Sequence, residues 1–235
     1  GTITDDTRLR HVFIDAILEN DGVFARGALK QHIAKRWESA EEGFEKEWLE
    51  EYALSAIRER LYVGGYPSNG GLISSLPAGL MFPGHADQAY RTAYEAIFIS
   101  QGYAIDCTAS YCAAIANSLA TDDESVPALL KRSVLEAPAD LVESRWFGRP
   151  LVRHFEKVER VVAESSEFSS YAPKFYQELT WPETYDALET FGFCVGVMLA
   201  NPDDPKQAVI EAVNLGRDND STATLVGGLM GARFG

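Results

Sequence analysis

Hydrophobic residues recur every three or four positions along most of the chain, which is the spacing of one buried face of an α-helix. No stretch shows convincing alternation of period two, so the predicted fold is all-α, with about nine or ten helices in one compact domain of residues 1–235. The clearest of the predicted helices span residues 9–18, 28–37, 44–57, 87–98, 104–120, 127–136, 151–162, 188–199, 205–214 and 222–234.

Two stretches interrupt this pattern. Residues 64–84 are rich in glycine and proline and predict a loop of about twenty residues, longer than a compact domain usually carries without a function. Such a loop lets a phosphate or a sugar approach backbone N–H groups, although a plain surface connection has the same composition. Residues 165–182 are polar and aromatic, and they form either a lid over a site or, as we favour, a segment packed on the outside.

Short clusters of hydroxyl and carboxylate side chains precede the first and the last predicted helix. These residue types are the preferred helix N-caps, so capping is the ordinary explanation for either cluster alone. Together they offer enough oxygen atoms to ligate a hard cation such as Mg²⁺. The six side chains are Thr4, Asp5, Asp6, Asp218, Asp220 and Ser221.

Glycines in the last predicted helix suggest how the two clusters meet. Each glycine inside a helix costs roughly 0.5 to 1 kcal/mol relative to alanine, so its presence suggests a close neighbour. Gly227 and Gly231 are four residues apart and share one face. We expect this face to touch the helix that follows Thr4-Asp5-Asp6, which would place the acidic clusters side by side.

Composition and charge narrow the function classes. The chain has 235 residues, 46% hydrophobic and 24% charged, as in an ordinary globular domain. The net charge of −14 argues against nucleic acid or an anionic membrane as partner. Cys107, Cys112 and Cys194 lie in apolar surroundings and predict buried free thiols in a reducing, cytoplasmic setting. The four histidines lack a His-x-x-x-His spacing, which disfavours a zinc hydrolase.

The paired acidic motifs resemble the two signature motifs of the ADP-ribosylglycohydrolase family. The resemblance rests on Thr4-Asp5-Asp6-Thr7 and on the segment 214–221, followed by Gly227 and Gly231, and it extends over nearly the whole chain. The family is all-helical, includes hydrolases that remove ADP-ribose from modified arginine or serine, and holds two Mg²⁺ ions between these motifs. The resemblance therefore implies a dinuclear Mg²⁺ site, with Mn²⁺ as an alternative.

The resemblance also implies residue roles. The six side chains of the acidic clusters would ligate the two cations, and Asp5 or Asp6 would orient the attacking water. The Gly-rich stretch and the segment after residue 100 would contact ADP-ribose or a related ribosyl substrate through Ser68, Asn69, Gly70, Gly71, Gln101 and Tyr103. The oligomeric state stays open.

Several departures from the family pattern keep alternatives open. Ser75 stands where relatives often carry arginine, and Ser100-Gln101 stands where many carry Thr-His. Glutamine can hydrogen-bond a ribose or a base but cannot titrate near neutral pH. By the same resemblance, we expect the family's first helix, with its acidic residue, and the extreme C-terminus to be missing from this sequence. We expect a hydrolase of ADP-ribosyl conjugates; the alternatives are a glycosidase for another ribosyl or nucleoside-like metabolite and a non-catalytic ADP-ribose-binding relative.

Overall fold

The computed structural model describes residues 4–41, 46–47, 49–50, 52–53, 66–120, 123–142, 148–164 and 167–235. These residues form helices and no β-strand, which confirms the all-α prediction. In the first half the helices are α1 (Asp5–Glu19), α2 (Arg26–Ser39), α4 (Gly70–Ser74), α5 (Leu76–Leu80), α6 (Ala86–Ala96) and α7 (Tyr103–Ser118). In the second half they are α8 (Val126–Leu135), α9 (Ala139–Val142), α10 (Pro150–Glu164), α11 (Phe168–Glu178), α12 (Ala187–Ala200), α13 (Pro205–Asn214) and α14 (Asn219–Phe234).

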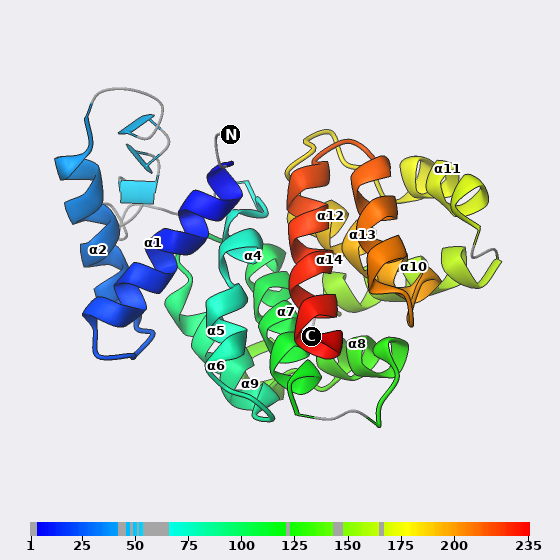
Figure 1. Ribbon diagram of the computed structural model, residues 1–235, viewed down its shortest axis with the longest axis horizontal. Helices are drawn as coiled ribbons and strands as arrows, with labels where there is room; N and C mark the ends of the chain where they lie inside the picture. The colour runs from blue at the N-terminus through cyan, green and yellow to red at the C-terminus, as the bar shows by residue number, and fades with distance from the viewer. Residues whose placement is uncertain are drawn as a thin grey trace.

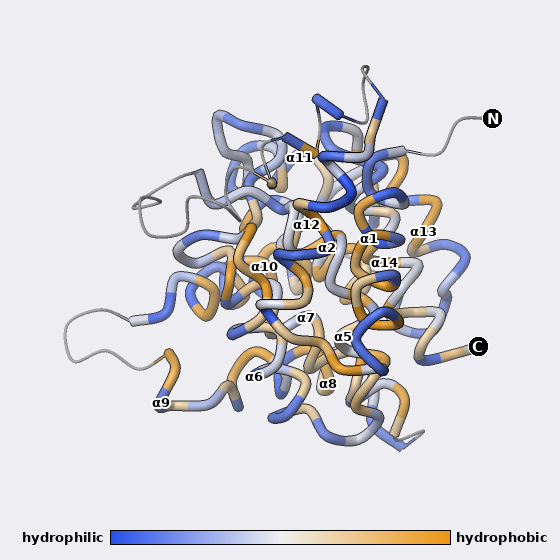
Figure 2. The backbone as a smooth tube through the Cα atoms, turned by 90° about the vertical axis from the view of Figure 1, so that its left-hand side faces the viewer, coloured by the Kyte–Doolittle hydropathy of each residue, from blue (hydrophilic) through white to orange (hydrophobic). Residues whose placement is uncertain are grey.

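The alanine-rich helix α7 is the centre of the packing. One hydrophobic cluster joins α7 to α8 and to α10 through α14, and a second joins it to α1, α2 and α4 to α6. Cys107 faces the first cluster and Cys112 the second, so α7 is buried nearly all round, as its composition predicts. Figure 2 shows hydrophobic and hydrophilic stretches alternating along the outer helices, as expected where only one face is buried. The predicted free, buried thiols are confirmed at Cys107, Cys112 and Cys194.

The first turns of the first and the last helix lie on one side of the molecule. Helix α1 contacts α4, α5 and α14, although α14 lies more than two hundred residues further along the chain. The first turns of α1 and α14 both lie at the upper end in Figure 1, with α4 between them. This arrangement places the side chains that open α1 and α14 near the start of α4.

The Gly-rich stretch is wrongly predicted as one long loop. In the described part of it, residues 66–84, the chain forms α4 and α5, and most of their residues are buried. A Cβ atom on Gly71 would lie 1.9 Å from Ser100 Oγ and 2.8 Å from Ile97 Cγ2. Glycine serves here to let α4 approach the chain before α7.

The expected role of Gly227 and Gly231 is also wrong. A Cβ atom on Gly231 would meet nothing within 4 Å, and one on Gly227 would only touch Val209 at 4.0 Å. The close approach is made by Gly228, where a Cβ atom would lie 2.6 Å from Tyr111 Oη. Helix α14 is therefore packed tightly against α7, and the glycines do not mark its contact with α1.

Two further predictions concern the helix expected at residues 44–57 and the polar, aromatic segment of residues 165–182. The predicted helix of residues 44–57 lies mostly outside the described residues, and the described positions within it, 46–47, 49–50 and 52–53, are helical. Residues 168–178 form α11, whose Tyr171 and Phe175 belong to the first hydrophobic cluster. None of the helices in the described part of the chain has both the length and the apolar character needed to cross a bilayer.

Candidate metal centre and pocket

The acidic side chains from the two ends of the chain come together. Asp5 and Asp6 lie in the first turn of α1, and Asp220 lies in the first turn of α14. One carboxylate oxygen from each of the three lies within 4.8 Å of the others. Ser221 Oγ donates a hydrogen bond to Asp6 Oδ1 at 3.3 Å, so the two helix N-termini are in direct contact. The structure thus joins one motif to the other at a single cluster.

Capping does not account for these side chains. Thr4 and Asp218 occupy the N-cap positions of α1 and α14, yet neither side chain makes a capping hydrogen bond. Some other helices of the same chain do have a side-chain cap: Asp186 accepts from the backbone of α12 and Asp204 from that of α13. The acidic clusters are therefore placed differently from ordinary N-caps, and the ligand explanation is favoured over the capping one.

The electrostatics of the cluster call for a cation. Burial, and then the charges of Asp220, Asp218 and Asp5, raise the pKa of Asp6 from 3.8 to about 7. Burial, opposed by a hydrogen bond from Asn69, raises the pKa of Asp218 to about 6. Asp6 Oδ2 is buried and has no hydrogen-bond partner among the described residues. A buried carboxylate oxygen without a donor is costly, and a bound cation would remove that cost, so these residues fit a hard divalent ion.

A pocket of about 490 Å³ opens beside this cluster. Nine of the residues predicted from the sequence line it: Asp5, Asp6, Ser68, Asn69, Gly70, Gln101, Asp218, Asp220 and Ser221. The other three, Thr4, Gly71 and Tyr103, are not in its wall. Thr4 is exposed, Gly71 is buried behind the wall against Ser100, and the Tyr103 hydroxyl donates to Asp186 Oδ2 at 2.6 Å.

The rest of the wall is aromatic and apolar, and sequence reasoning missed it. Among the described residues, this part of the wall is formed by Tyr52, Tyr66, Ile73, Ile99 and Tyr185. The Tyr66 and Tyr185 rings meet edge to face with centroids 5.3 Å apart, and Tyr66 Oη donates to Asp186 Oδ2 at 3.1 Å. Burial and the charge of Asp186 raise the pKa of Tyr66, so its phenol keeps its proton. Only Tyr66 could have been suggested from the sequence, because it directly precedes Pro67-Ser68-Asn69. Nothing in the sequence indicates that Tyr185 lies beside it.

Comparison with protein-family models matches the chain to ADP-ribosylglycohydrolase over residues 1–235. The chain belongs to the ADP-ribosylglycohydrolase family. No curated protein matches it. The membership supports hydrolase activity of the glycohydrolase type, and the family is typically metal-dependent, in keeping with the acidic cluster.

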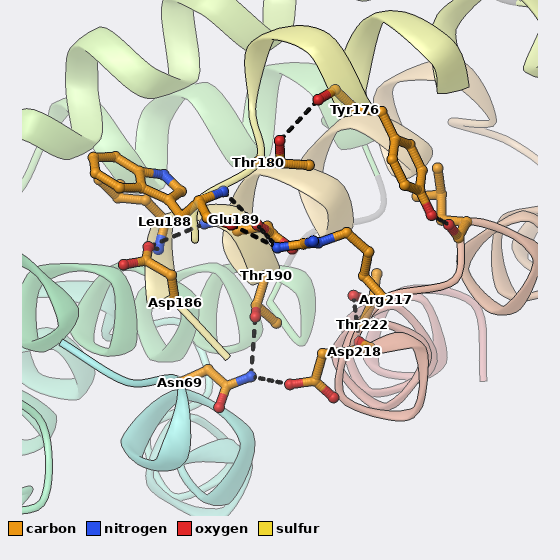
Figure 3. A network of polar contacts seen from close by, with 12 residues as sticks. Asn69, Tyr176, Thr180, Asp186, Leu188, Glu189, Thr190, Arg217, Asp218 and Thr222 are labelled. Carbon is orange, nitrogen blue, oxygen red and sulfur yellow. Dashed lines mark hydrogen bonds and ion pairs between the residues drawn. The ribbon is translucent and has the colours of Figure 1, made fainter. Parts of the chain in front are cut away.

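In this member of the ADP-ribosylglycohydrolase family, a shared asparagine links the Gly-rich stretch to the second acidic motif. Asn69 Nδ2 donates to Asp218 Oδ2 at 2.6 Å and to Thr190 Oγ1 at 2.9 Å, as Figure 3 shows. Both N–H groups of the amide are therefore engaged within the protein. Asn69 lines the pocket, and its amide nitrogen also supports an acidic side chain of the cluster.

Proposed function

We propose that this chain is a Mg²⁺-dependent hydrolase that cleaves the N- or O-glycosidic bond between ADP-ribose and a protein side chain or small molecule. The observation that carries the proposal is the meeting of Asp5 and Asp6 with Asp220 at the wall of a pocket of about 490 Å³. Three buried free thiols and the acidic net charge of −14 support a reducing, cytoplasmic setting without nucleic acid or membrane as partner.

The side chains that would hold Mg²⁺, as two ions and with Mn²⁺ as the alternative, are Thr4, Asp5, Asp6, Asp218, Asp220 and Ser221. When bound, Mg²⁺ neutralises the clustered carboxylates and polarises the oxygen groups that it contacts. The unpartnered Oδ2 of buried Asp6 and the raised pKa of its carboxyl both support this assignment.

The remaining wall of the pocket would bind and orient the substrate. Ser68 and Gly70 lie at the start of α4, where a hydroxyl and backbone N–H groups suit a phosphate or ribose oxygen. Gln101 lines the same pocket and offers an amide for a hydroxyl or a base. Asp5 or Asp6 orients the water that attacks the anomeric carbon, and the glycosidic bond to the aglycone breaks through an oxocarbenium-like state.

A second candidate is a glycosidase for another ribosyl or nucleoside-like metabolite. The observation that favours it is the lining itself, because Gln101 and three tyrosines line the pocket and no histidine is among its described wall residues. A pocket of this kind can hold a nucleobase by stacking and by neutral hydrogen bonds.

Product analysis separates the two candidates. The full chain is incubated with ADP-ribosyl-arginine, ADP-ribosyl-serine and simple nucleosides, with Mg²⁺ or with EDTA, and the products are separated by chromatography. We expect free ADP-ribose from at least one conjugate with Mg²⁺ and none with EDTA. Release from nucleosides alone would support the second candidate. Binding of ADP-ribose without any turnover would contradict both and leave a non-catalytic relative.

A matched pair of variants ties the activity to the cluster. Asp220→Asn removes one carboxylate of the cluster, and Asp203→Asn makes the same change of charge at an exposed turn between α12 and α13. We expect the first variant to lose at least about 100-fold in kcat/KM, since the carboxylates of the cluster act as one unit and the loss of one disables the others. The second should keep the wild-type rate. Equal activity of the two variants would contradict the assignment of the site.

A further inference from the structure

We propose that Glu189, Thr190 and Arg217 are positioning residues that hold the second acidic motif in its ligand-binding conformation. The inference rests on the proposed function, because it concerns how the chain presents the carboxylates of Asp218 and Asp220 to a divalent cation. None of the three residues lines the pocket. They act from behind it, through the first turn of α12.

The backbone just before Asp218 adopts a conformation that needs support. Gly216 has φ +73° and Arg217 has φ +55°, so two consecutive residues lie in the left-handed region. Glycine adopts this region freely, whereas a residue with a long side chain does so at a cost. Arg217 therefore stays there because its surroundings compensate for the strain.

An ion pair with α12 supplies that compensation. Arg217 Nε donates to Glu189 Oε1 at 2.5 Å and Arg217 Nη2 donates to Glu189 Oε2 at 2.9 Å, the two-point geometry of a strong pair. Arg217 Nη2 also donates to the carbonyl of Trp181 at 2.7 Å, and Trp181 N donates to Glu189 Oε2 at 2.7 Å. The Glu189 side chain is 2% exposed, so its charge depends on this partner. Figure 3 shows the Arg217 side chain extending across to the first turn of α12.

Thr190, which follows Glu189 in α12, supports Asp218, which follows Arg217 in the loop. Thr190 Oγ1 accepts from Asn69 Nδ2, and the same nitrogen donates to Asp218 Oδ2 (Figure 3). Glu189 thus fixes Arg217 directly, and Thr190 fixes Asp218 through Asn69. A third contact with the loop comes from α11, where Tyr176 Oη donates a hydrogen bond to the carbonyl of Leu215. The loop is therefore held at Leu215, Arg217 and Asp218, immediately before Asp220.

Groups that orient metal ligands from behind commonly change metal affinity by 10- to 100-fold when they are removed. A pair that only neutralises buried charge would instead change stability and leave metal affinity unaltered. Metal affinity and thermal stability, measured on the same variants, distinguish the two roles.

The test is a calorimetric titration of Mg²⁺ into the metal-free full chain. Arg217→Gly removes the guanidinium but tolerates the positive φ. The double variant Arg217→Gly/Glu189→Gln also removes the charge left behind in the interior. The control is Arg132→Met, which breaks a comparable pair, Arg132 to Glu124 at 2.5 Å, in the region of the far end of α14.

We expect both Arg217 variants to bind Mg²⁺ at least tenfold more weakly, the double variant to regain thermal stability over the single one, and the control to bind as the wild type does. Wild-type affinity within about twofold in the folded double variant would overturn the inference. Absence of binding by the wild type would instead refute the proposed function, and the inference would fall with it.

Thr190→Val provides a second route if the Arg217 variants do not fold. It keeps the shape of the side chain and removes only the acceptor of Asn69 Nδ2. We expect Mg²⁺ affinity to fall several-fold, together with a lower melting temperature in EDTA, because a buried N–H group of Asn69 loses its acceptor. Unchanged affinity in this variant would overturn the positioning role of the α12 turn.

Discussion

Replacing Asp6 by asparagine should stabilise the metal-free protein while it removes the response to Mg²⁺. Asp6 is 2% exposed, lies among Asp5, Asp218 and Asp220, and carries an oxygen without a hydrogen-bond partner among the described residues. Asparagine has the same shape without the charge, and its Oδ1 still accepts from Ser221. The variant therefore removes the repulsion between this carboxylate and its acidic neighbours, and the cost of burying its charge, while the side chain keeps its packing.

The magnitude follows from the pKa of Asp6. The difference between 3.8 and about 7 corresponds to about 4 kcal/mol. Between these values the folded protein holds a proton on Asp6 that the unfolded chain has lost. The free energy of unfolding of the metal-free wild type therefore decreases as the pH rises through this window. Asparagine does not titrate, so the variant lacks this decrease.

The assay is urea denaturation of both proteins in EDTA at several pH values. We expect the stability difference in favour of Asp6→Asn to grow by about 3 kcal/mol between about pH 5 and about pH 8. Titrating groups that do not interact with Asp6 cancel in the difference, and Asp203→Asn serves as a control with the same loss of charge at an exposed site. A difference that is independent of pH, or that favours the wild type more at high pH, would refute the reasoning about the cluster.

Three further predictions test the surroundings of the site. Gly71→Ala should destabilise the protein by about 2 kcal/mol or more because of its clash with a buried hydroxyl, whereas Gly231→Ala, which meets nothing, should stabilise it by about 0.5 kcal/mol in thermal melts; equal effects would contradict the packing. Burial lowers the pKa of His154 from 6.5 to about 4, so the contribution of this residue to stability should fall by about 3 kcal/mol as the pH drops from 6.5 to 4. In urea titrations this fall should be seen as the stability of the wild type minus that of His154→Leu, and a difference independent of pH would contradict the assignment. Tyr66→Phe loses the hydrogen bond to Asp186 and should raise KM about three- to tenfold with kcat little changed, whereas a lower kcat at constant KM would argue against a role in binding.

The periodicity of apolar residues was enough to predict an all-α fold and most helix positions. It failed in the Gly-rich stretch because composition does not distinguish a loop from short helices whose glycines allow close packing. Gly71 is such a case, since its missing Cβ makes room for Ser100. The contact of α14 was misassigned for a related reason: among three nearby glycines, only the fold decides that Gly228 faces Tyr111.

The candidate site was predictable where residue type alone carries the chemistry. Asp5, Asp6 and Asp220 could be named from spacing and from the family resemblance, and the structure brings them together. The wall residue Tyr185 and the supporting residue Glu189 could not be named in this way. In the sequence, Asp186 and Glu189 have the spacing of an N-terminal capping box, which gives Glu189 an ordinary structural explanation. Only the fold shows that Glu189 contacts Arg217 in the loop of the second motif.

The central claim is that carboxylates from the two ends of the chain form one metal site. The most direct test is calorimetric titration of Mg²⁺ into the metal-free wild type and into Asp5→Asn and Asp220→Asn, with Asp203→Asn as control. The account predicts that the wild type and the control bind Mg²⁺ and that each of the other two variants loses most of this affinity, because their carboxylates share one cluster. Binding that survives in both variants, or no binding by the wild type, would contradict it.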